Sequence, residues 1–151
     1  MNEVIRRKEL WNITYDHALG ETASRFFVEI RDNKKIYGRK EAKTGRVLVP
    51  PRAFSDQNLE PTTDWVAVGP GGVIEAFTIV YDAFRGLPDP PYAFGYVTLD
   101  GAGTSIGGFF RGIDLTKPHE AAKKMKIGTR VATKFAEKRV GDVLDFWFEL
   151  A

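Results

Sequence analysis

Four polar residues stand where a small metal-binding fold would carry its ligands. Glu41 and Thr44 form one pair, and Ser55 and Asn58 form a second, with two residues between the members of each pair. A zinc knuckle needs two such pairs on tight turns, so that four side chains meet as a tetrahedron. Gly45 follows the first pair, where a knuckle turn requires a residue that can take positive φ. The spacing therefore indicates the frame of a zinc ribbon.

The chemistry of these four side chains is poor for zinc. The chain of 151 residues has no cysteine, which excludes thiolate ligands and disulfides. One carboxylate, two hydroxyls and one amide supply a single anionic oxygen and no sulfur or imidazole. We therefore expect no zinc and no other cofactor, and we expect side-chain-to-backbone hydrogen bonds from Ser55 and Asn58 to hold the turns. His17 and His119 lie far from the frame in sequence and are predicted to be surface residues.

Around this frame the sequence resembles the zinc-ribbon/OB-fold acyl-CoA-associated proteins, a family long catalogued as a domain of unknown function. Members often read Cys-x-x-Cys-Gly-(Lys/Arg)-(hydrophobic)-x-x-Pro-Pro-Arg-x-x-Cys-x-x-Cys, and this chain has the four polar residues at the cysteine positions. The other matching residues are Gly45, Arg46, Val47, Pro50, Pro51 and Arg52. Later segments also match, namely "GPGGVIEAFTIVYDAF", "PPYAFGYVTLDGAG" and "KIGTRVATKF". The resemblance covers about residues 20–150.

One helix is predicted before the ribbon frame, over residues 22–33. Ala23, Phe26, Phe27 and Ile30 recur at the spacing of one helical face. Thr22 is the expected N-cap, and the helix should end near residue 33. Residues 1–21 are polar with scattered aromatics and are expected to pack as an arm on the rest of the protein or on a partner.

The C-terminal part reads as about five short strands with glycine interruptions and without a βαβ rhythm. This pattern is typical of a small barrel such as the five-stranded OB-fold. "GPGG" predicts a hairpin between two strands in residues 64–84, the second buried on both faces because apolar residues occupy both. "KPHEAAKKMK" is expected to be a short polar helix or loop.

We therefore predict a mainly β protein. An N-terminal arm and helix would occupy residues 1–35, a degenerate, metal-free, rubredoxin-like zinc ribbon residues 36–62, and an OB-fold barrel residues 63–151. The formal net charge of +2 gives no sign of a nucleic-acid or membrane partner. No apolar run is long enough for a signal peptide or a bilayer span, so a cytoplasmic protein is expected.

The resemblance implies a non-catalytic accessory subunit that docks on a thiolase-like or hydroxymethylglutaryl-CoA-synthase-like enzyme and helps to bind or channel acyl-CoA. An acyl-CoA needs an apolar channel for its pantetheine arm and cations for its phosphates. The proline loop offers an apolar lip of Pro90, Pro91, Tyr92 and Phe94. The candidate phosphate partners are Arg46, Arg52, Arg85 and Arg111. Trp11 and Tyr15 are of the residue types that anchor interfaces.

Two other functions remain open from the sequence. An OB barrel can bind single-stranded nucleic acid by stacking bases on aromatics; the candidates here are Tyr96, Phe109, Phe110, Arg111 and Trp65. Phe109 and Phe110 are adjacent, so one of them must face the core if both lie in a strand. An enzyme that uses His17 or His119 as a base is the third possibility, although there is no cysteine nucleophile, Gly-x-Ser-x-Gly elbow or P-loop lysine.

Overall fold

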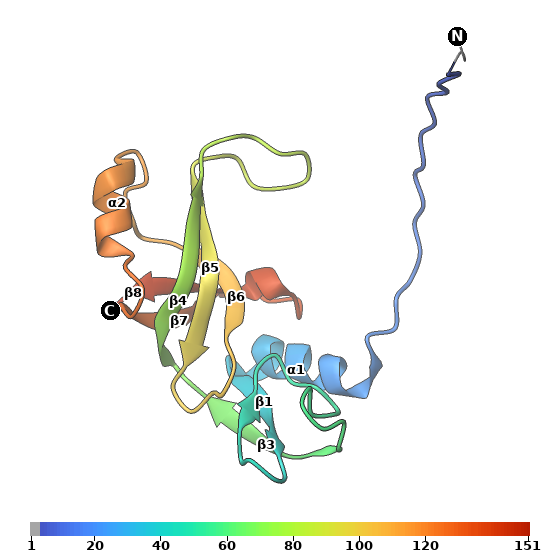
Figure 1. The fold of residues 1–151 in the computed structure, drawn as a ribbon, viewed down its shortest axis with the longest axis vertical. Coiled ribbons are helices and arrows are strands. Elements are labelled where there is room, and N and C mark those ends of the chain that lie inside the picture. The colour runs from blue at the N-terminus through green and yellow to red at the C-terminus, as the bar shows by residue number, and fades with distance from the viewer. Residues whose placement is uncertain (1–3) are drawn as a thin grey trace.

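The structure is a computed structural model that describes residues 4–151 (Figure 1). The first three residues of the expected arm lie outside the described part. Residues 4–19 form neither helix nor strand, and their side chains are exposed. Figure 1 shows them running away from the body of the molecule.

The first helix, α1, spans Gly20–Asn33. Phe26 and Ile30 are buried, which confirms the predicted apolar face. The predicted N-cap at Thr22 is wrong, because the helix begins two residues earlier and has no side-chain cap bond. Gly20 has a φ of +75°, a conformation that glycine reaches without steric cost and that lets the chain turn into the helix there.

A three-stranded antiparallel sheet follows α1. Its strands are β1 (Ile36–Glu41), β2 (Val47–Leu48) and β3 (Thr62–Val68), in the order β2-β1-β3. The expected barrel, over residues 63–151, would include almost all of β3, but β3 pairs with β1 and so belongs to the small sheet. The predicted "GPGG" hairpin is wrong, since β3 pairs with β1 and the next strand pairs elsewhere. Gly69, with φ +79°, turns the chain from one sheet into the other.

The C-terminal part has five further strands, β4 (Gly71–Val80), β5 (Tyr92–Leu99), β6 (Ile106–Phe110), β7 (Arg130–Phe135) and β8 (Phe146–Leu150). They form a barrel, as predicted, and the barrel is closed with the strand order β4-β5-β6-β8-β7. This is the five-strand count of the OB-fold. A short helix, α2 (Pro118–Lys124), lies between β6 and β7, and a 3₁₀ turn, η1 (Val143–Asp145), precedes β8.

Strand β4 is not buried on both faces, contrary to the prediction. Its register against β5 shifts between Ile74 and Ala76. A bulge changes which side chains point inward, so Ile74 before it and Phe77 and Ile79 after it all contact the core. Glu75, Ala76 and Thr78 are exposed. Ile74, Phe77 and Ile79 thus face the core although they come from both alternating sets of residues.

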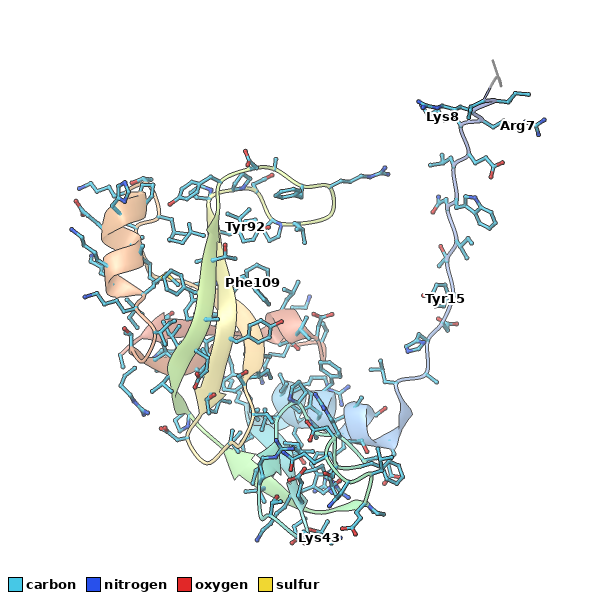
Figure 2. All side chains as sticks on the ribbon, viewed as in Figure 1. Arg7, Lys8, Tyr15, Lys43, Tyr92 and Phe109 are labelled. Atoms are coloured by element: carbon cyan, nitrogen blue, oxygen red, sulfur yellow. The ribbon has the colours of Figure 1, made fainter. Side chains whose placement is uncertain are left out.

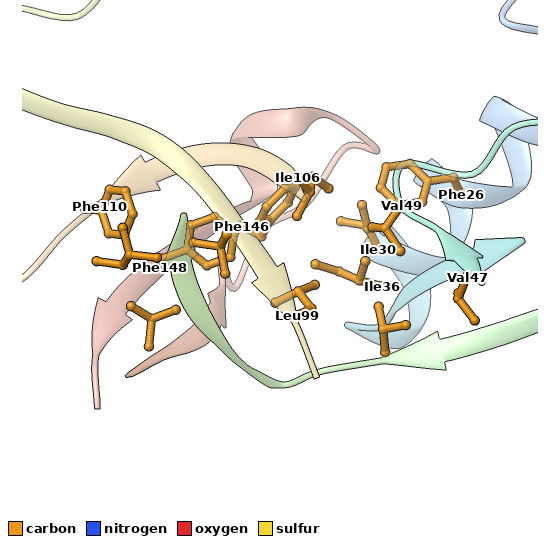
Figure 3. Packing of buried hydrophobic residues seen from close by; sticks show 14 of the residues in the cluster. Phe26, Ile30, Ile36, Val47, Val49, Leu99, Ile106, Phe110, Phe146 and Phe148 are labelled. Atoms are coloured by element: carbon orange, nitrogen blue, oxygen red, sulfur yellow. The ribbon is translucent and has the colours of Figure 1, made fainter. Parts of the chain in front are cut away.

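One hydrophobic core runs through the helix, the small sheet and the barrel (Figure 3). Ile30 of α1 and Ile36 of β1 lie beside Leu99 and Ile106 of the barrel in that view. Hydrogen bonds also join the small sheet to the β5–β6 loop: the Thr104 hydroxyl accepts from the N–H of Val49 (2.7 Å) and donates to its carbonyl (2.8 Å). Among residues 4–151, neither helix is long and apolar enough to cross a bilayer.

Candidate functional site

An apolar pocket of about 320 Å³ lies at one end of the barrel, beside the proline loop. Three of the predicted lip and cation residues, Pro91, Tyr92 and Arg111, line it together. Pro91 precedes β5 directly, where a residue without an N–H costs no ladder bond. The remaining lining comes from Pro88, Phe109, Phe110, Leu115 and Leu144.

The walls of this pocket are held by aromatic and polar contacts. The Tyr92 and Phe109 rings meet edge to face at 5.8 Å. The Tyr81 hydroxyl donates to the carbonyl of Leu115 (3.0 Å), which ties the segment after β6 to the residue that follows β4. The Arg111 guanidinium lies 4.3 Å from the centroid of Trp147, so a cation is positioned at the edge of an otherwise apolar slot.

The other predicted ligand residues lie elsewhere. Phe94 lines a separate, shallow hollow of about 230 Å³ on the outer face of β4 and β5. Pro90 is half-buried in the proline loop but does not line the pocket. Arg46 and Arg52 belong to the small-sheet region, and Figure 2 places Lys43 of that region and Tyr92 of the pocket at opposite ends of the body. Arg85 is exposed in the loop after β4.

An aromatic cluster covers the outer face of β5 and β6. Phe94 contacts Phe109 at 5.3 Å and Tyr96 at 6.1 Å, both edge to face. Phe110, which was one candidate for base stacking, points into the core and is buried. Trp65 lies in the small sheet, and its ring centroid is 4.6 Å from the guanidinium group of Arg25 and 5.2 Å from that of Arg39.

The ribbon frame contains two turns that are closed in the same way. The N–H of Gly45 donates to the Glu41 carbonyl (3.0 Å), and the N–H of Leu59 donates to the Ser55 carbonyl (3.2 Å). The fifth residue of each turn is left-handed, with φ +71° at Gly45 and +59° at Leu59. The spacing that predicted two knuckle turns thus describes the backbone correctly.

The two turns meet at the carboxylate of Glu41, whose residue is only 2% exposed. The hydroxyls of Thr44 and Ser55 both donate to it, the latter at 2.7 Å. The Arg46 guanidinium donates to both carboxylate oxygens, at 2.9 and 3.1 Å. These donors, Arg46 first, lower the pKa of the Glu41 carboxyl to about 2. We call Glu41, Thr44, Arg46 and Ser55 the polar centre.

Zinc does not fit the polar centre. The hydroxyls of Thr44 and Ser55 already donate hydrogen bonds to Glu41. The guanidinium cation of Arg46 lies against the same carboxylate, where a zinc ion would have to bind. The fourth frame residue, Asn58, instead accepts from the N–H of Glu60 (3.1 Å). The Ser55 oxygen accepts from the N–H groups of residues 57 and 58, so the predicted side-chain-to-backbone bonds of Ser55 and Asn58 are confirmed.

The two candidate arginines of the ribbon, Arg46 and Arg52, have carboxylate partners within the chain. Arg46 reaches Asp56 as well as Glu41, and Arg52 lies 3.3 Å from Asp56. Their charges are therefore matched locally, whereas Arg111 is at the apolar pocket. Sequence reasoning overlooked Asp56 because it lies between the frame positions. It also overlooked Leu115 and Leu144, which no local motif connects with the proline loop.

The histidines lie apart from these sites. His17 is exposed in the arm and His119 is exposed on α2. Within residues 4–151, no group of three or more histidine or acidic side chains is arranged to hold a metal ion.

The barrel resembles a known domain family. Residues 65–136 match the family model described as the C-terminal OB-fold domain of ChsH2. The matched range includes β4 to β7, so the barrel is an OB-fold domain, as predicted. No curated protein matches the chain.

Two solved structures are similar over most of the chain. A chain of the Ltp2-ChsH2(DUF35) aldolase has a TM-score of 0.65 and 16% identity, over 89% of this chain and 98% of that one. A protein of unknown function from the DUF35 family of Sulfolobus solfataricus has a TM-score of 0.63 and 17% identity, over 87% of each chain. At this identity the likeness concerns the fold.

Proposed function

We propose that this chain is a non-catalytic accessory subunit of a thiolase-superfamily enzyme, and that it belongs to the zinc-ribbon/OB-fold family that its sequence resembles. The observation that carries the proposal is the likeness to nearly the whole of a chain from the Ltp2-ChsH2(DUF35) aldolase. That likeness extends beyond the barrel, and the barrel itself matches the ChsH2 domain model. The exposed aromatic arm supports a role in binding another protein.

The barrel pocket is the proposed contact with acyl-CoA. Its volume of about 320 Å³ is at the lower end of ligand sites, so it suits a pantetheine arm or acyl chain rather than a whole coenzyme. Arg111 stands at its edge, where an exposed guanidinium can meet a phosphate. We do not assign this role to Arg46 or Arg52, because their partners are Glu41 and Asp56.

We propose that the polar centre holds the two turns of the ribbon together, as a bound zinc ion would. A buried carboxylate joins the two turns through Ser55 and Thr44, and the Arg46 cation balances its charge. Hydrogen bonds between Val49 and Thr104 join the ribbon to the barrel. They help to hold the ribbon in position relative to the barrel.

A turnover assay tests the accessory role. The purified chain is added to each purified thiolase-fold enzyme of the source organism, with acyl-CoA substrate present. The proposal expects no turnover by the chain alone and a changed rate for at least one enzyme when the chain is added. Turnover by the chain alone, or unchanged rates with every enzyme, would contradict it.

A single-strand nucleic-acid binder is the second candidate, and the aromatic cluster on β5 and β6 favours it. These are the second and third strands of the barrel, the face on which OB-folds bind oligonucleotides. A labelled oligonucleotide decides between the two functions. Salt-dependent binding that Phe94→Ala weakens would support this candidate, because counterion release must accompany phosphate contacts.

A further inference from the structure

The arm carries the pattern of a β-strand although it belongs to no sheet. Trp11, Ile13 and Tyr15 alternate with Asn12, Thr14 and Asp16. In an extended chain, alternate side chains point to opposite faces, so one face would be apolar and the other polar. Aromatic and β-branched residues, which favour strands, dominate the sequence here.

The apolar face of this segment is uncovered. Trp11 is 76% exposed, Tyr15 75% and Ile13 64%. Within the described part of the chain, no hydrogen bond is found that involves residues 10–16, so their backbone N–H and C=O groups have no partner among the described residues. A segment with strand chemistry, exposed aromatics and unpaired backbone groups is suited to pairing with an open sheet edge.

The arm leaves from a fixed point. It joins α1, whose Phe26 and Ile30 are buried in the common core. The C-terminal end of α1 is tied to the barrel, because the Arg139 guanidinium donates to the carbonyl of Arg31 (2.7 Å). An extended segment over residues 4–19 can span about 50 Å, so it can reach well across a bound protein while the body stays in place.

The sheets of this chain do not use the segment. The barrel is closed and has no free edge strand, and the outer strand β2 has only two residues. The other outer strand, β3, pairs only with β1 in this sheet, and residues 4–19 do not pair with its outer edge. The complementary edge is therefore assigned to another molecule.

We propose that residues 10–16 add as a strand to an exposed sheet edge of the enzyme partner, with Trp11, Ile13 and Tyr15 in an apolar groove beside that edge. This inference rests on the proposed function, because it names the contact through which the accessory subunit docks. The preceding cations, Arg6, Arg7 and Lys8, suit an acidic rim next to the groove.

Amide hydrogen exchange resolved by NMR tests the proposal in the purified complex of the full chain with a thiolase-fold enzyme. A strand added to one edge directs every second N–H toward its neighbour. We expect every second amide of residues 10–16 to exchange at least tenfold more slowly in the complex than in the free chain. Uniform protection, or no protection, overturns strand addition.

A substitution series provides a second readout. Proline and alanine are placed in turn at Asn12, Ile13 and Thr14, and the Kd for the enzyme is measured. At a position whose N–H pairs with the enzyme, the proline variant should have a Kd about tenfold higher than the alanine variant. At the neighbouring positions, the Kd values of the proline and alanine variants should agree within about threefold. Trp11→Ala should weaken binding about tenfold or more, and Lys123→Ala, at an exposed position on α2, serves as the control.

The outcomes separate this inference from the function on which it rests. A complex that forms equally well after deletion of residues 4–16 overturns the strand addition and leaves the accessory role standing. A chain that binds no thiolase-fold enzyme overturns both. Free chains that form a dimer dependent on Trp11 would show that a second copy, and not an enzyme, takes the arm.

Discussion

At the scale of single residues, the buried carboxylate of Glu41 is the most informative group. Its pKa is lowered to about 2 by hydrogen bonds from Arg46, Thr44 and Ser55, against about 4.3 for an unperturbed glutamate. A depressed pKa stabilises the fold at pH values above the unfolded-state pKa, and this stabilisation is lost as the pH falls toward 2. The carboxylate should therefore stabilise the ribbon fully at neutral pH.

We predict that Glu41→Gln lowers the free energy of unfolding at pH 7 and that the difference from the unmodified chain narrows between about pH 4.5 and pH 2. Urea unfolding at a series of pH values measures it. Glu75→Gln, at an exposed side chain, is the matched control and should leave the pH dependence unchanged. A constant difference across this range would show that Glu41 does not act through its charge.

The left-handed residues of the two turns give a paired prediction. Leu59 adopts φ +59° with its side chain exposed. Gly45 adopts φ +71°, and a Cβ there would meet only the end of the Lys40 side chain, at an ordinary contact distance of 3.8 Å. Leu59→Gly should stabilise the fold by about 0.5–1 kcal/mol, and Gly45→Ala should destabilise it by about 1 kcal/mol. Thermal unfolding measures both variants, and Tm should rise for Leu59→Gly and fall for Gly45→Ala. Tm shifts of the same sign would show that the two turns do not share the same backbone requirement.

At the scale of elements, the helix α1 joins the ribbon to the barrel through one core. Ile30→Ala should cost about 2–5 kcal/mol, because a fully buried isoleucine leaves a cavity. The exposed Val28→Ala on the same helix should change stability by less than about 0.5 kcal/mol. Fluorescence and circular dichroism should report a single, coincident urea transition in both variants; separate transitions would mean that ribbon and barrel unfold independently.

The elements also show what the sequence could predict. The 3.6-residue repeat identified the buried face of α1, and the adjacency of Phe109 and Phe110 correctly required one of them to face the core. Glycine and proline at residues 69–72 marked a turn, but such residues report a change of chain direction and not which strands pair afterwards. The bulge after Ile74 was missed because one inserted residue makes a one-sided strand look apolar on both faces.

Only part of the candidate site was predictable, because some of its residues belong to a local sequence signal and others come from distant segments. Pro91 and Tyr92 could be found because a proline loop next to a strand is a local signal. Leu115 and Leu144 complete the pocket from distant segments, and only the closing of the barrel brings them there. The convergence of Glu41 and Ser55 was implied by the ribbon spacing, but the bidentate Arg46 was not.

At the scale of the whole molecule, the pocket predicts a stabilising ligand. Acetoacetyl-CoA at 100 times its Kd should raise Tm by about 5–10 °C, since such saturation adds about 2.7 kcal/mol. Leu144→Trp, which fills the pocket, should abolish the shift, whereas Val143→Trp should preserve it; both residues are 55% exposed, but only Leu144 lines the pocket. Equal shifts in both variants would place the ligand elsewhere.

The central claim is that this chain works as part of a larger enzyme, and a mass measurement tests it most directly. Sedimentation velocity is run on the chain, on each thiolase-fold enzyme of the source organism, and on their mixtures at about 10 µM, above a Kd of 1 µM. The account predicts that with at least one enzyme the chain sediments in a heavier, stoichiometric complex. Sedimentation of the chain as a separate species in every mixture would contradict it.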